Sequence, residues 1–446
     1  MASSSKPMIG EGGDGHLAEK KEEEKRRILP ADMQREILSR TPARSLLRFR
    51  PACKIWYELT YDPAFIDLHV ERAHLRKISG GTPHLLAISQ RIGGGHFGFS
   101  IIILDETMTP ITKISCPGLI DERCLRLYFG RNRFARSTPP YRMTRPCNGL
   151  VCVYNYFGDA LLVNPMTGEG LPLRQHSEPV ESYYCFQKCY LGFHPVTKEY
   201  KLVRFLDSGR DSMAEVFYEV LTLGTGIWRR RRIYHGDKNL SACSEDFLSG
   251  YEWHQTKKIL GDGISANGVV YILNQIHRKI GLFDLKEEKF STVIPYHDSI
   301  SVDEHRPKLV ELEGGICLVV RSSIPQEILD IWMLEDAADH VRWIHRCRVA
   351  LHHQLIGSKI IPILIHQGEL LVGHMNRDFY HLSRMNCNFH YLSLRSNTES
   401  PRKVNNEQLQ DLRVVHAYEG SLVSFGGKSL RSDDDQFKHA ALYRSP

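Results

Sequence analysis

Short apolar runs separated by turn residues fill most of this chain and constrain its fold more than any other feature. From about Pro83 onward the runs are rich in β-branched and aromatic residues and are bounded by Gly, Pro, Asn and Asp. Examples are HLLAIS, SIIILDE, GLVCVYNY, DALLVNP, YKLVRFL, FYEVLTL, GVVYILN, KIGLFDL, GICLVVRS, LDIWMLE, GELLVGH and SLVSFGG. This pattern is typical of strands and predicts a large all-β domain over residues 83–446.

A weak internal repeat runs through these strands. A glycine opens an apolar run at Gly149, Gly268, Gly315, Gly368 and Gly420, and the last three intervals are 47, 53 and 52 residues. Such intervals match the length of a four-stranded propeller blade. The repeat therefore predicts a β-propeller of about six blades, with a two-sheet sandwich or two smaller β domains as alternatives.

The segment before the strands has a helical pattern instead. Leu29, Met33 and Ile37 recur at intervals of four, with Leu38 beside them, which places an apolar stripe on one face of a short helix. We expect Pro30 and Asp32 to start this helix, Asp32 by accepting hydrogen bonds from free N–H groups and by complementing the positive end of the helix dipole. Two more short helices are predicted before residue 70.

Prolines mark the expected ends of these helices. Thr41-Pro42 stops the first, and Ser45 opens a second run. Pro51 interrupts that run near Arg50, and Asp62-Pro63 ends the segment. About forty residues rarely form a stable unit alone, so we expect the segment to complete its apolar surface against another protein or against the rest of the chain.

Composition describes a globular protein. The chain is 42% hydrophobic and 25% charged, with a net charge of +6. No run of about 18 apolar residues occurs, so we expect no membrane partner and a location in the cytoplasm, the nucleus or both. The 11 cysteines have no metal or disulfide pattern and are expected to be buried thiols. Residues 1–27 are mixed in charge and nearly free of apolar side chains, which predicts a disordered tail.

Candidate chemical motifs give no positive case for catalysis or metal binding. Histidines occur at His194, His352, His353, His374 and His381, without metal-site spacing to cysteines or acids. Cys185 and Cys189 are four apart, but no second pair lies at finger-like distance, and Gly93–Gly95 lacks the residues of a phosphate-binding loop. We therefore expect no cofactor and no metal.

Four consecutive arginines, Arg229–Arg232, form the most basic stretch. They follow Trp228 and could bind a nucleic acid strand or act as a nuclear import signal. In a strand their side chains would alternate between two faces. This favours an exposed strand end over a nucleic-acid site.

Five motifs in the helical segment now suggest a family. They are Leu29-Pro30-Ala31-Asp32, Ile37-Leu38-Ser39-Arg40, Ser45-Leu46-Leu47-Arg48-Phe49-Arg50, Cys53-Lys54-Ile55-Trp56 and Asp62-Pro63-Ala64-Phe65. In this order they resemble the F-box of the large plant families. Two positions depart from its usual pattern: Thr41 stands in place of a leucine, and Pro51-Ala52 precedes the cysteine. Both departures could weaken the binding of the adaptor protein that an F-box recognises.

The strand region resembles the F-box-associated domain that follows plant F-boxes and is similar to kelch-like propellers. The resemblance is carried by CNGLVCV, LLVNPMTGE, LGFHPVTKEYKLVRF, YEVLTLGTGIWRR, ANGVVYIL and IGLFDLKEEKFS. It is clear over residues 143–295, whereas 296–446 share only the repeat. The expected organisation is a tail at 1–27, an F-box at 28–70, a linker at 71–82 and the propeller-like domain at 83–446.

The resemblance implies a non-catalytic receptor subunit of an SCF-type cullin-RING ubiquitin ligase. The F-box would bind a Skp-type adaptor and, through it, a cullin, while the β-domain would bind a protein target of unknown identity. Residues expected to divide between the F-box core and the adaptor face are Leu29, Pro30, Ile37, Leu38, Leu46, Leu47, Cys53 and Trp56. The alternative is a propeller that binds or converts a glycan or small molecule, with the helices as a cap.

Overall fold

The computed structural model of this chain describes residues 29–78, 84–93, 96–116, 141–155, 159–173, 185–207, 216–233, 260–274, 278–297, 300, 307–322, 327–337, 340–356, 358–375, 387–394, 401–404 and 412–430. The chain divides into two compact units, Met1–Arg72 and Ala73–Pro446. Helices form the described part of the first unit, and strands form most of the described part of the second. The tail predicted at 1–27 lies outside the described residues.

Prolines precede the first two helices of the helical unit. The helical elements are α2 (Ala31–Ser39), α3 (Ala43–Phe49), the 3₁₀ turn η1 (Arg50–Ala52), α4 (Lys54–Leu59) and α5 (Pro63–Ile78). Pro30 and Pro42 occupy the capping positions of α2 and α3, and neither helix has a side-chain cap. Pro30 and Asp32 do start α2, as predicted, but Asp32 is not the capping residue. Asp32 lies in the first turn, where its charge complements the helix dipole.

The break predicted at Pro51 is correct, whereas the second run starts two residues earlier than predicted. Pro51 does break the second run: α3 ends at Phe49, and the chain passes through η1 before α4. That run begins at Ala43, however, rather than at Ser45.

Asp62-Pro63 opens a helix instead of ending the segment. The Asp62 carbonyl accepts a hydrogen bond from the Ile66 amide at 2.9 Å, and its Oδ1 accepts one from the Ala64 amide at 3.1 Å. Proline is well tolerated at the first helical position, because the N–H that it lacks would have no helical partner. The resulting helix, α5, is 16 residues long, so the predicted linker at 71–82 is helical as far as Ile78.

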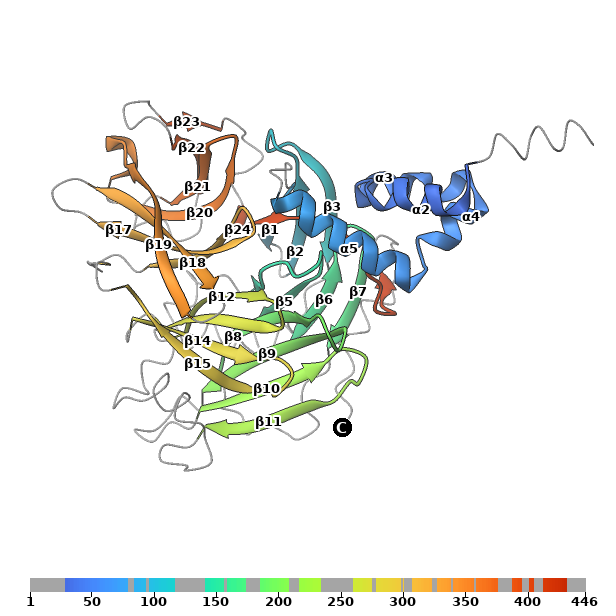
Figure 1. Ribbon diagram of the computed structural model, residues 1–446, viewed down its shortest axis with the longest axis horizontal. Coiled ribbons are helices and arrows are strands. Elements are labelled where there is room, and N and C mark those ends of the chain that lie inside the picture. Colours follow the sequence, from blue (N-terminus) through green and yellow to red (C-terminus); the bar gives the residue numbers. More distant parts are fainter. Residues whose placement is uncertain are drawn as a thin grey trace, which may run out of the picture. The chain divides into compact units, whose positions relative to one another are not determined.

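Six antiparallel sheets account for the strands described in the second unit, and they form a ring in Figure 1. In chain order, the strands are β1 (His84–Gly93), β2 (His96–Leu104), β3 (Pro110–Cys116), β4 (Tyr141–Met143), β5 (Val151–Asn155), β6 (Ala160–Asn164), β7 (Glu169–Leu173), β8 (Cys185–His194), β9 (Glu199–Asp207), β10 (Val216–Thr222), β11 (Trp228–Ile233), β12 (Leu260–Ala266), β13 (Val269–Asn274), β14 (Lys279–Asp284), β15 (Lys289–Pro295), β16 (Lys308–Leu312), β17 (Gly315–Ser322), β18 (Ile328–Ala337), β19 (His340–Ala350), β20 (Lys359–His366), β21 (Glu369–Met375), β22 (Cys387–Ser393), β23 (Arg402–Lys403), β24 (Leu412–Tyr418) and β25 (Lys428–Ser429). A 3₁₀ turn, η4 (His353–Leu355), precedes β20.

The sheets are the blades of a six-bladed propeller, as the repeat predicted. Their strand orders are β24-β1-β2-β3, β25-β7-β6-β5-β4, β11-β10-β9-β8, β12-β13-β14-β15, β16-β17-β18-β19 and β20-β21-β22-β23. The innermost strands contact one another in the order β8, β12, β16, β20, β24. We number the blades 1 to 6 in this order of sheets. A two-sheet sandwich and two separate β domains are thereby excluded.

The repeat seen in the sequence is a turn between the first two strands of a blade. At Asn148-Gly149, Asn267-Gly268, Glu313-Gly314 and Gln367-Gly368 both residues have a positive φ. This is the geometry of a two-residue hairpin turn of type I′, which favours glycine at its second position. Gly420 was wrongly placed in the series, because residues 419–427, which include the predicted strand SLVSFGG, form no strand. The other eleven predicted runs all contain strands.

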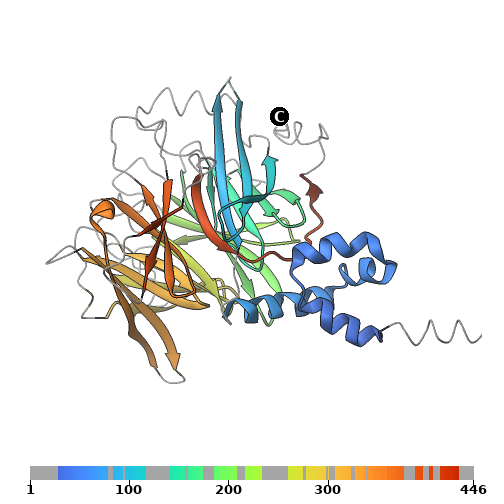
Figure 2. The same ribbon diagram turned by 90° about the horizontal axis from the view of Figure 1, so that it is seen from above.

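The C-terminal segment closes the ring twice. β24 is the innermost strand of blade 1, and β25 then adds a short outer strand to blade 2 by pairing with β7. In the segment between β24 and β25, the carbonyls of Ser421 (3.1 Å) and Val423 (2.8 Å) accept hydrogen bonds from the side-chain amide of the buried Asn164. Figure 2 shows the red β24 beside the blue β1–β2 hairpin. Strands from opposite ends of the chain therefore share one sheet.

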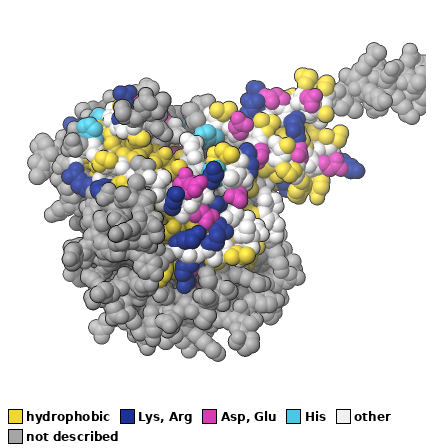
Figure 3. Space-filling view, turned by 60° about the horizontal axis from the view of Figure 1, so that its bottom comes forward, with side chains coloured by type: hydrophobic (Ala, Val, Ile, Leu, Met, Phe, Trp, Pro, Cys, Tyr) yellow, Lys and Arg dark blue, Asp and Glu magenta, His cyan; other side chains and the backbone are white. Residues whose placement is uncertain are grey.

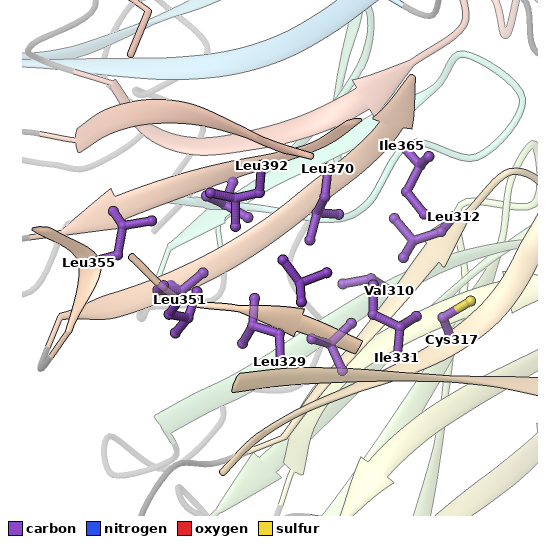
Figure 4. Packing of buried hydrophobic residues seen from close by; sticks show 14 residues of the cluster. Val310, Leu312, Cys317, Leu329, Ile331, Leu351, Leu355, Ile365, Leu370 and Leu392 are labelled. Carbon is purple, nitrogen blue, oxygen red and sulfur yellow. The ribbon is translucent and has the colours of Figure 1, made fainter. Parts of the chain in front are cut away.

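Apolar side chains fill the space between neighbouring blades. One cluster joins blades 5 and 6 and includes Leu312, Ile331, Leu351, Leu370 and Leu392, which point toward one another in Figure 4. Similar clusters join blades 3 and 4, blades 4 and 5, and blades 6 and 1. Blades 4, 5 and 6 are thus covered on both faces by their neighbours, which explains why their strands appear in the sequence as nearly continuous apolar runs.

Candidate functional site

An apolar stripe lies on the solvent side of α2. Leu29, Met33 and Ile37 have exposed fractions of 48%, 52% and 52%. Met33 and Ile37 are four residues apart and lie on one face of the helix, and Leu29 lies just before its capping residue, Pro30. The residues turned about 100° or more away, Leu38 and Ser39, are buried. The stripe that the sequence revealed therefore faces away from the buried side of α2, and we call these three residues the α2 stripe.

Side chains of α3 and α4 extend this apolar surface. The Trp56 indole Nε1 donates a hydrogen bond to Gln34 Oε1 at 2.8 Å, and Gln34 Nε2 donates one to the Leu29 carbonyl at 2.7 Å. The Phe49 ring packs on Trp56 with a centroid separation of 5.9 Å. Phe49 and Ile55 are themselves 41% and 54% exposed. In Figure 3, yellow apolar side chains are visible on the surface of the helical unit, at the right of the view. Large exposed apolar patches of this kind mark interaction sites.

Ion pairs and hydrogen bonds hold α2 to α5 and to the turn before it. Arg35 pairs with Asp62, and Arg72 of α5 pairs with Glu36 at 3.1 Å. Arg40 also contacts Glu36, and its hydrogen bond lowers the pKa of that exposed carboxyl. These contacts use only polar side chains, so the α2 stripe is left uncovered within the helical unit.

The eight residues expected at the core or the adaptor face occupy three kinds of position. Leu38 and Leu46 are buried, at 5% and 1% exposed. Leu47, Cys53 and Trp56 are half-buried, whereas Leu29, Pro30 and Ile37 are exposed.

The prediction missed Met33, Phe49 and Ile55, which are exposed. Met33 could have been found from its interval of four with Leu29 and Ile37. Phe49 and Ile55 carry no such signal, because their exposure depends on how α3 and α4 pack.

The two departures from the usual F-box pattern are accommodated locally. The Thr41 hydroxyl donates a hydrogen bond to the Ile37 carbonyl at 3.1 Å. The Thr41 carbonyl in turn lies 2.9 Å from Nε2 of the buried His69. Pro51 is exposed and occupies the start of η1, where its missing N–H leaves no helical bond unmade.

A second candidate site is a group of charged residues at the propeller axis. Arg145 of blade 2 donates a hydrogen bond from Nη2 to the Leu309 carbonyl of blade 5 at 2.7 Å. Blades 2 and 5 are opposite each other in a six-blade ring, so this bond crosses the axis. Lys308, also on blade 5, forms an ion pair with Asp262 of blade 4 at 3.4 Å.

Mutual electrostatic effects extend this group to two further inner strands. Three cations, Lys308, Lys188 and Arg145, overcome the effect of burial and lower the pKa of Asp262 to about 2. Burial, together with Arg145 and Lys188, lowers the pKa of His416 to about 3. We call Arg145, Lys188, Asp262, Lys308 and His416 the axial cluster. Sequence reasoning missed it, because its members are far apart in the chain and have no common motif.

The arginine run contributes to packing in blade 3. Arg230 pairs with the fully buried Glu219 at 2.7 Å, and Arg229 pairs with Glu288 of blade 4. Arg231 is exposed, and the side chain of Arg232 lies outside the described residues. Two of the three described arginines are therefore neutralised by acids, which supports the prediction that the run is not a continuous nucleic-acid strip.

The remaining motifs form no site in the described part of the chain. His194 bonds to Thr197, and the rings of His352 and His353 lie 3.9 Å apart. His381 and the Cys185 side chain lie outside the described residues. Among the described residues, no group of three or more His, Cys, Asp or Glu could hold a metal ion, and no helix has the length and apolar character needed to cross a membrane. Gly93, at the end of β1, pairs with His96, at the start of β2, as expected for a hairpin.

Comparison with known families gives two matches that follow the two units. Residues 28–67 match the family model of the F-box domain. Residues 131–422 match that of the F-box associated beta propeller domain. The second match covers more than half of the chain.

Several plant proteins are similar in sequence. F-box protein At1g47340 of Arabidopsis thaliana is 26% identical over 333 residues, which cover 71% of this chain and 62% of that protein. F-box protein At3g61340 of the same plant is 26% identical over 345 residues, 72% of this chain and 75% of that protein. The chain thus spans less than two thirds of the first relative's length. Among solved structures, the β-propeller domain of Cps50 (Swd1) from Myceliophteria thermophila has 9% identity and a TM-score of 0.35, covering 74% of this chain and 89% of that one.

Proposed function

Because this chain belongs to the family of F-box proteins with an F-box associated β-propeller domain, we propose that it is the substrate-recognition subunit of an SCF-type cullin-RING ubiquitin ligase. The helical unit binds a Skp-type adaptor that connects it to a cullin, and the propeller binds a protein target. The subunit contributes proximity between the target and the ubiquitin-charged enzyme, which can accelerate a reaction without any reacting group of its own.

The α2 stripe is the observation that carries this proposal. Three large apolar side chains are each about half exposed: Met33 and Ile37 on the face of α2 away from its buried side, and Leu29 just before the capping residue. Covering such side chains with a partner contributes roughly 1 kcal/mol for each. The ion pairs of α2 with α5 hold the stripe in position without covering it. An apolar helix face of this kind suits a protein partner with an apolar groove.

The proposal is tested with a variant that places acids in the stripe. Replacing Met33 and Ile37 together with glutamate would bury two unpaired charges under the adaptor. Both side chains are more than half exposed, so the fold of the helical unit should be unchanged. We expect wild-type chain and adaptor to co-elute as a stoichiometric complex. The double variant should bind at least about 100-fold more weakly in calorimetry, from the lost apolar burial and the added charges.

A matched control makes the same chemical change elsewhere. Val196 and Ile227 are 84% and 66% exposed in turns of blade 3, and their glutamate variants should bind the adaptor like wild type. Circular dichroism of all the variants reports whether they are folded. If the folded wild-type chain formed no complex with the adaptor, the docking role would be refuted, and a propeller binding a glycan or small molecule would become the better hypothesis.

A further inference from the structure

The side-chain amide of Gln34 joins the start of the helical unit to α4. Its Oε1 accepts a hydrogen bond from the Trp56 indole Nε1 at 2.8 Å, and its Nε2 donates one to the Leu29 carbonyl at 2.7 Å. Gln34 and Trp56 are both half-buried. One side chain of α2 therefore contacts two residues outside this helix, one just before it in the chain and one on α4.

An amide is the group that these two contacts require. The indole N–H only donates and the backbone carbonyl only accepts, so the side chain between them must offer an acceptor and a donor at once. An ionised glutamate has no donor for the Leu29 carbonyl, and a lysine has no acceptor for the Trp56 indole. Asparagine has the same amide on a side chain that is one methylene shorter. The contacts therefore fit glutamine in both chemistry and length.

The bond to the Leu29 carbonyl holds a residue that lies outside the helix. The capping position of α2 is taken by Pro30, whose side chain has no donor or acceptor. Leu29 is 48% exposed, so packing covers only about half of its side chain. The hydrogen bond from Gln34 therefore helps to set where this apolar side chain lies.

The bond from Trp56 places an aromatic ring beside the α2 stripe. Ile37 follows Gln34 by three positions, and residues three apart are neighbours on a helix surface. The Phe49 ring packs on the Trp56 ring with a centroid separation of 5.9 Å. Apolar side chains from α2, α3 and α4, and the one before α2, are thus grouped around a single amide.

The two hydrogen bonds of Gln34 gain strength when a partner covers them. A hydrogen bond becomes stronger as the local dielectric falls. If a residue without polar atoms replaced Gln34, the indole N–H and the Leu29 carbonyl would lose this partner. Covering them would then cost more than one hydrogen bond contributes in water. Gln34 should therefore affect the binding of a partner more than it affects the stability of the helical unit.

We propose that Gln34 is a positioning residue of the adaptor-binding surface, which holds Leu29 and Trp56 in the arrangement that the Skp-type adaptor meets. This inference rests on the proposed function, because it takes the α2 stripe and its neighbours as the surface that the adaptor covers. Gln34 acts through Leu29 and Trp56, whose side chains make the apolar contact.

Isothermal titration calorimetry of the full-length chain with the purified adaptor measures the effect. Gln34→Met keeps the approximate shape and the helix propensity of the side chain but removes both hydrogen bonds. It should weaken binding about tenfold, with little change in thermal unfolding. Glu58→Met is the control: Glu58 is 63% exposed and lies about 200° around α4 from Trp56. This variant should bind the adaptor like wild type.

A double-mutant cycle tests the link between Gln34 and Trp56. Trp56→Phe keeps an aromatic ring but removes the N–H that donates to Gln34. In that background Gln34→Met should weaken binding only about threefold, because only the bond to the Leu29 carbonyl is then lost.

A spectroscopic measurement tests the same bond in the free chain. Tryptophan labelled with ¹⁵N gives an indole N–H resonance for Trp56, which is identified by its absence from the Trp56→Phe spectrum. Gln34→Met should move this resonance upfield, because the indole N–H loses its acceptor.

The proposal is overturned if folded Gln34→Met chain binds the adaptor like wild type, or if this change weakens binding by the same factor with and without the Trp56 indole. An unmoved Trp56 resonance would also overturn it. A loss of thermal stability as large as the loss of binding would show a structural role instead. Wild-type chain that forms no complex would refute the docking role itself, a result distinct from wild type and variant binding equally well.

Discussion

Replacing Glu219 with glutamine is expected to destabilise the propeller strongly, because this carboxylate is buried between two arginines. Glu219 is fully inaccessible, and it accepts hydrogen bonds from Arg204 Nε at 2.5 Å and from Arg230 Nε at 2.7 Å. The side chains of Arg204 and Arg230 are 4% and 25% exposed. The Arg204 guanidinium also lies 3.6 Å from the centroid of the buried Trp228 ring.

The expected magnitude follows from this difference in burial. Glutamine keeps the shape of Glu219 but leaves the charge of Arg204 buried without its counter-ion, which typically costs about 3–5 kcal/mol. Arg230→Gln removes the partly exposed member instead and should cost about 1 kcal/mol, since Arg204 still neutralises the carboxylate. The sharper prediction is therefore that Glu219→Gln lowers the free energy of unfolding several times more than Arg230→Gln does.

Urea unfolding, followed by tryptophan fluorescence and far-UV circular dichroism, measures both variants against wild type. Arg231→Gln is the control, because Arg231 is exposed and lies beside Arg230 on β11. Its free energy of unfolding should remain within about 0.5 kcal/mol of wild type. If Glu219→Gln and Arg230→Gln lowered the free energy of unfolding equally, the argument from burial would be refuted. The arginine run would then need an explanation other than packing in blade 3.

Three further predictions test other parts of the structure. Burial and the neighbouring His374 lower the pKa of His390 to about 4 from an ordinary 6.5, so the unfolded chain binds the proton first. The stability that this histidine contributes should be complete above pH 6.5 and be lost as the pH falls toward 4, and a His390→Gln variant should show a smaller loss in urea unfolding across that range. Leu46→Ala, at a site 1% exposed, should cost about 2–5 kcal/mol and unfold the helical unit, measured as lost adaptor binding with an unchanged propeller transition. Gly149→Ala should destabilise more than Gly224→Ala: both have a positive φ, which costs about 1–2 kcal/mol, but only at Gly149 would the new Cβ lie 2.4 Å from a neighbour, Ser421 Oγ. Equal melting temperatures for the two glycine variants would contradict this.

Much of the propeller could be predicted because its signals are local. A buried strand needs apolar residues, and a two-residue hairpin needs a residue that accepts a positive φ, so each blade shows both in its own sequence. Gly149, Gly268 and Gly368 occupy such turns and were found correctly. Gly420 was misassigned because it also precedes apolar residues. There, burial comes from closing the ring rather than from strand pairing: Ser421 and Val423 bond to Asn164.

The helical unit shows where local signals stop. Proline at residue 63 is compatible with both the end of one helix and the start of another, and only the packing of Phe65, fully buried, shows which occurs. The interval of four in Leu29, Met33 and Ile37 showed that these side chains share a face. It could not show that this face is exposed, since a core stripe and a partner-binding stripe have the same period.

The sequence by itself determined the order of helices and strands, the blade repeat and the family, because these depend on residues close together in the chain. Tertiary structure alone decided which side of α2 is exposed and which acids neutralise the arginine run. It also brought Arg145, Lys188, Asp262, Lys308 and His416 together at one axis. The physical reason is that closing a ring of blades places distant strands side by side, and charges interact through space rather than along the chain.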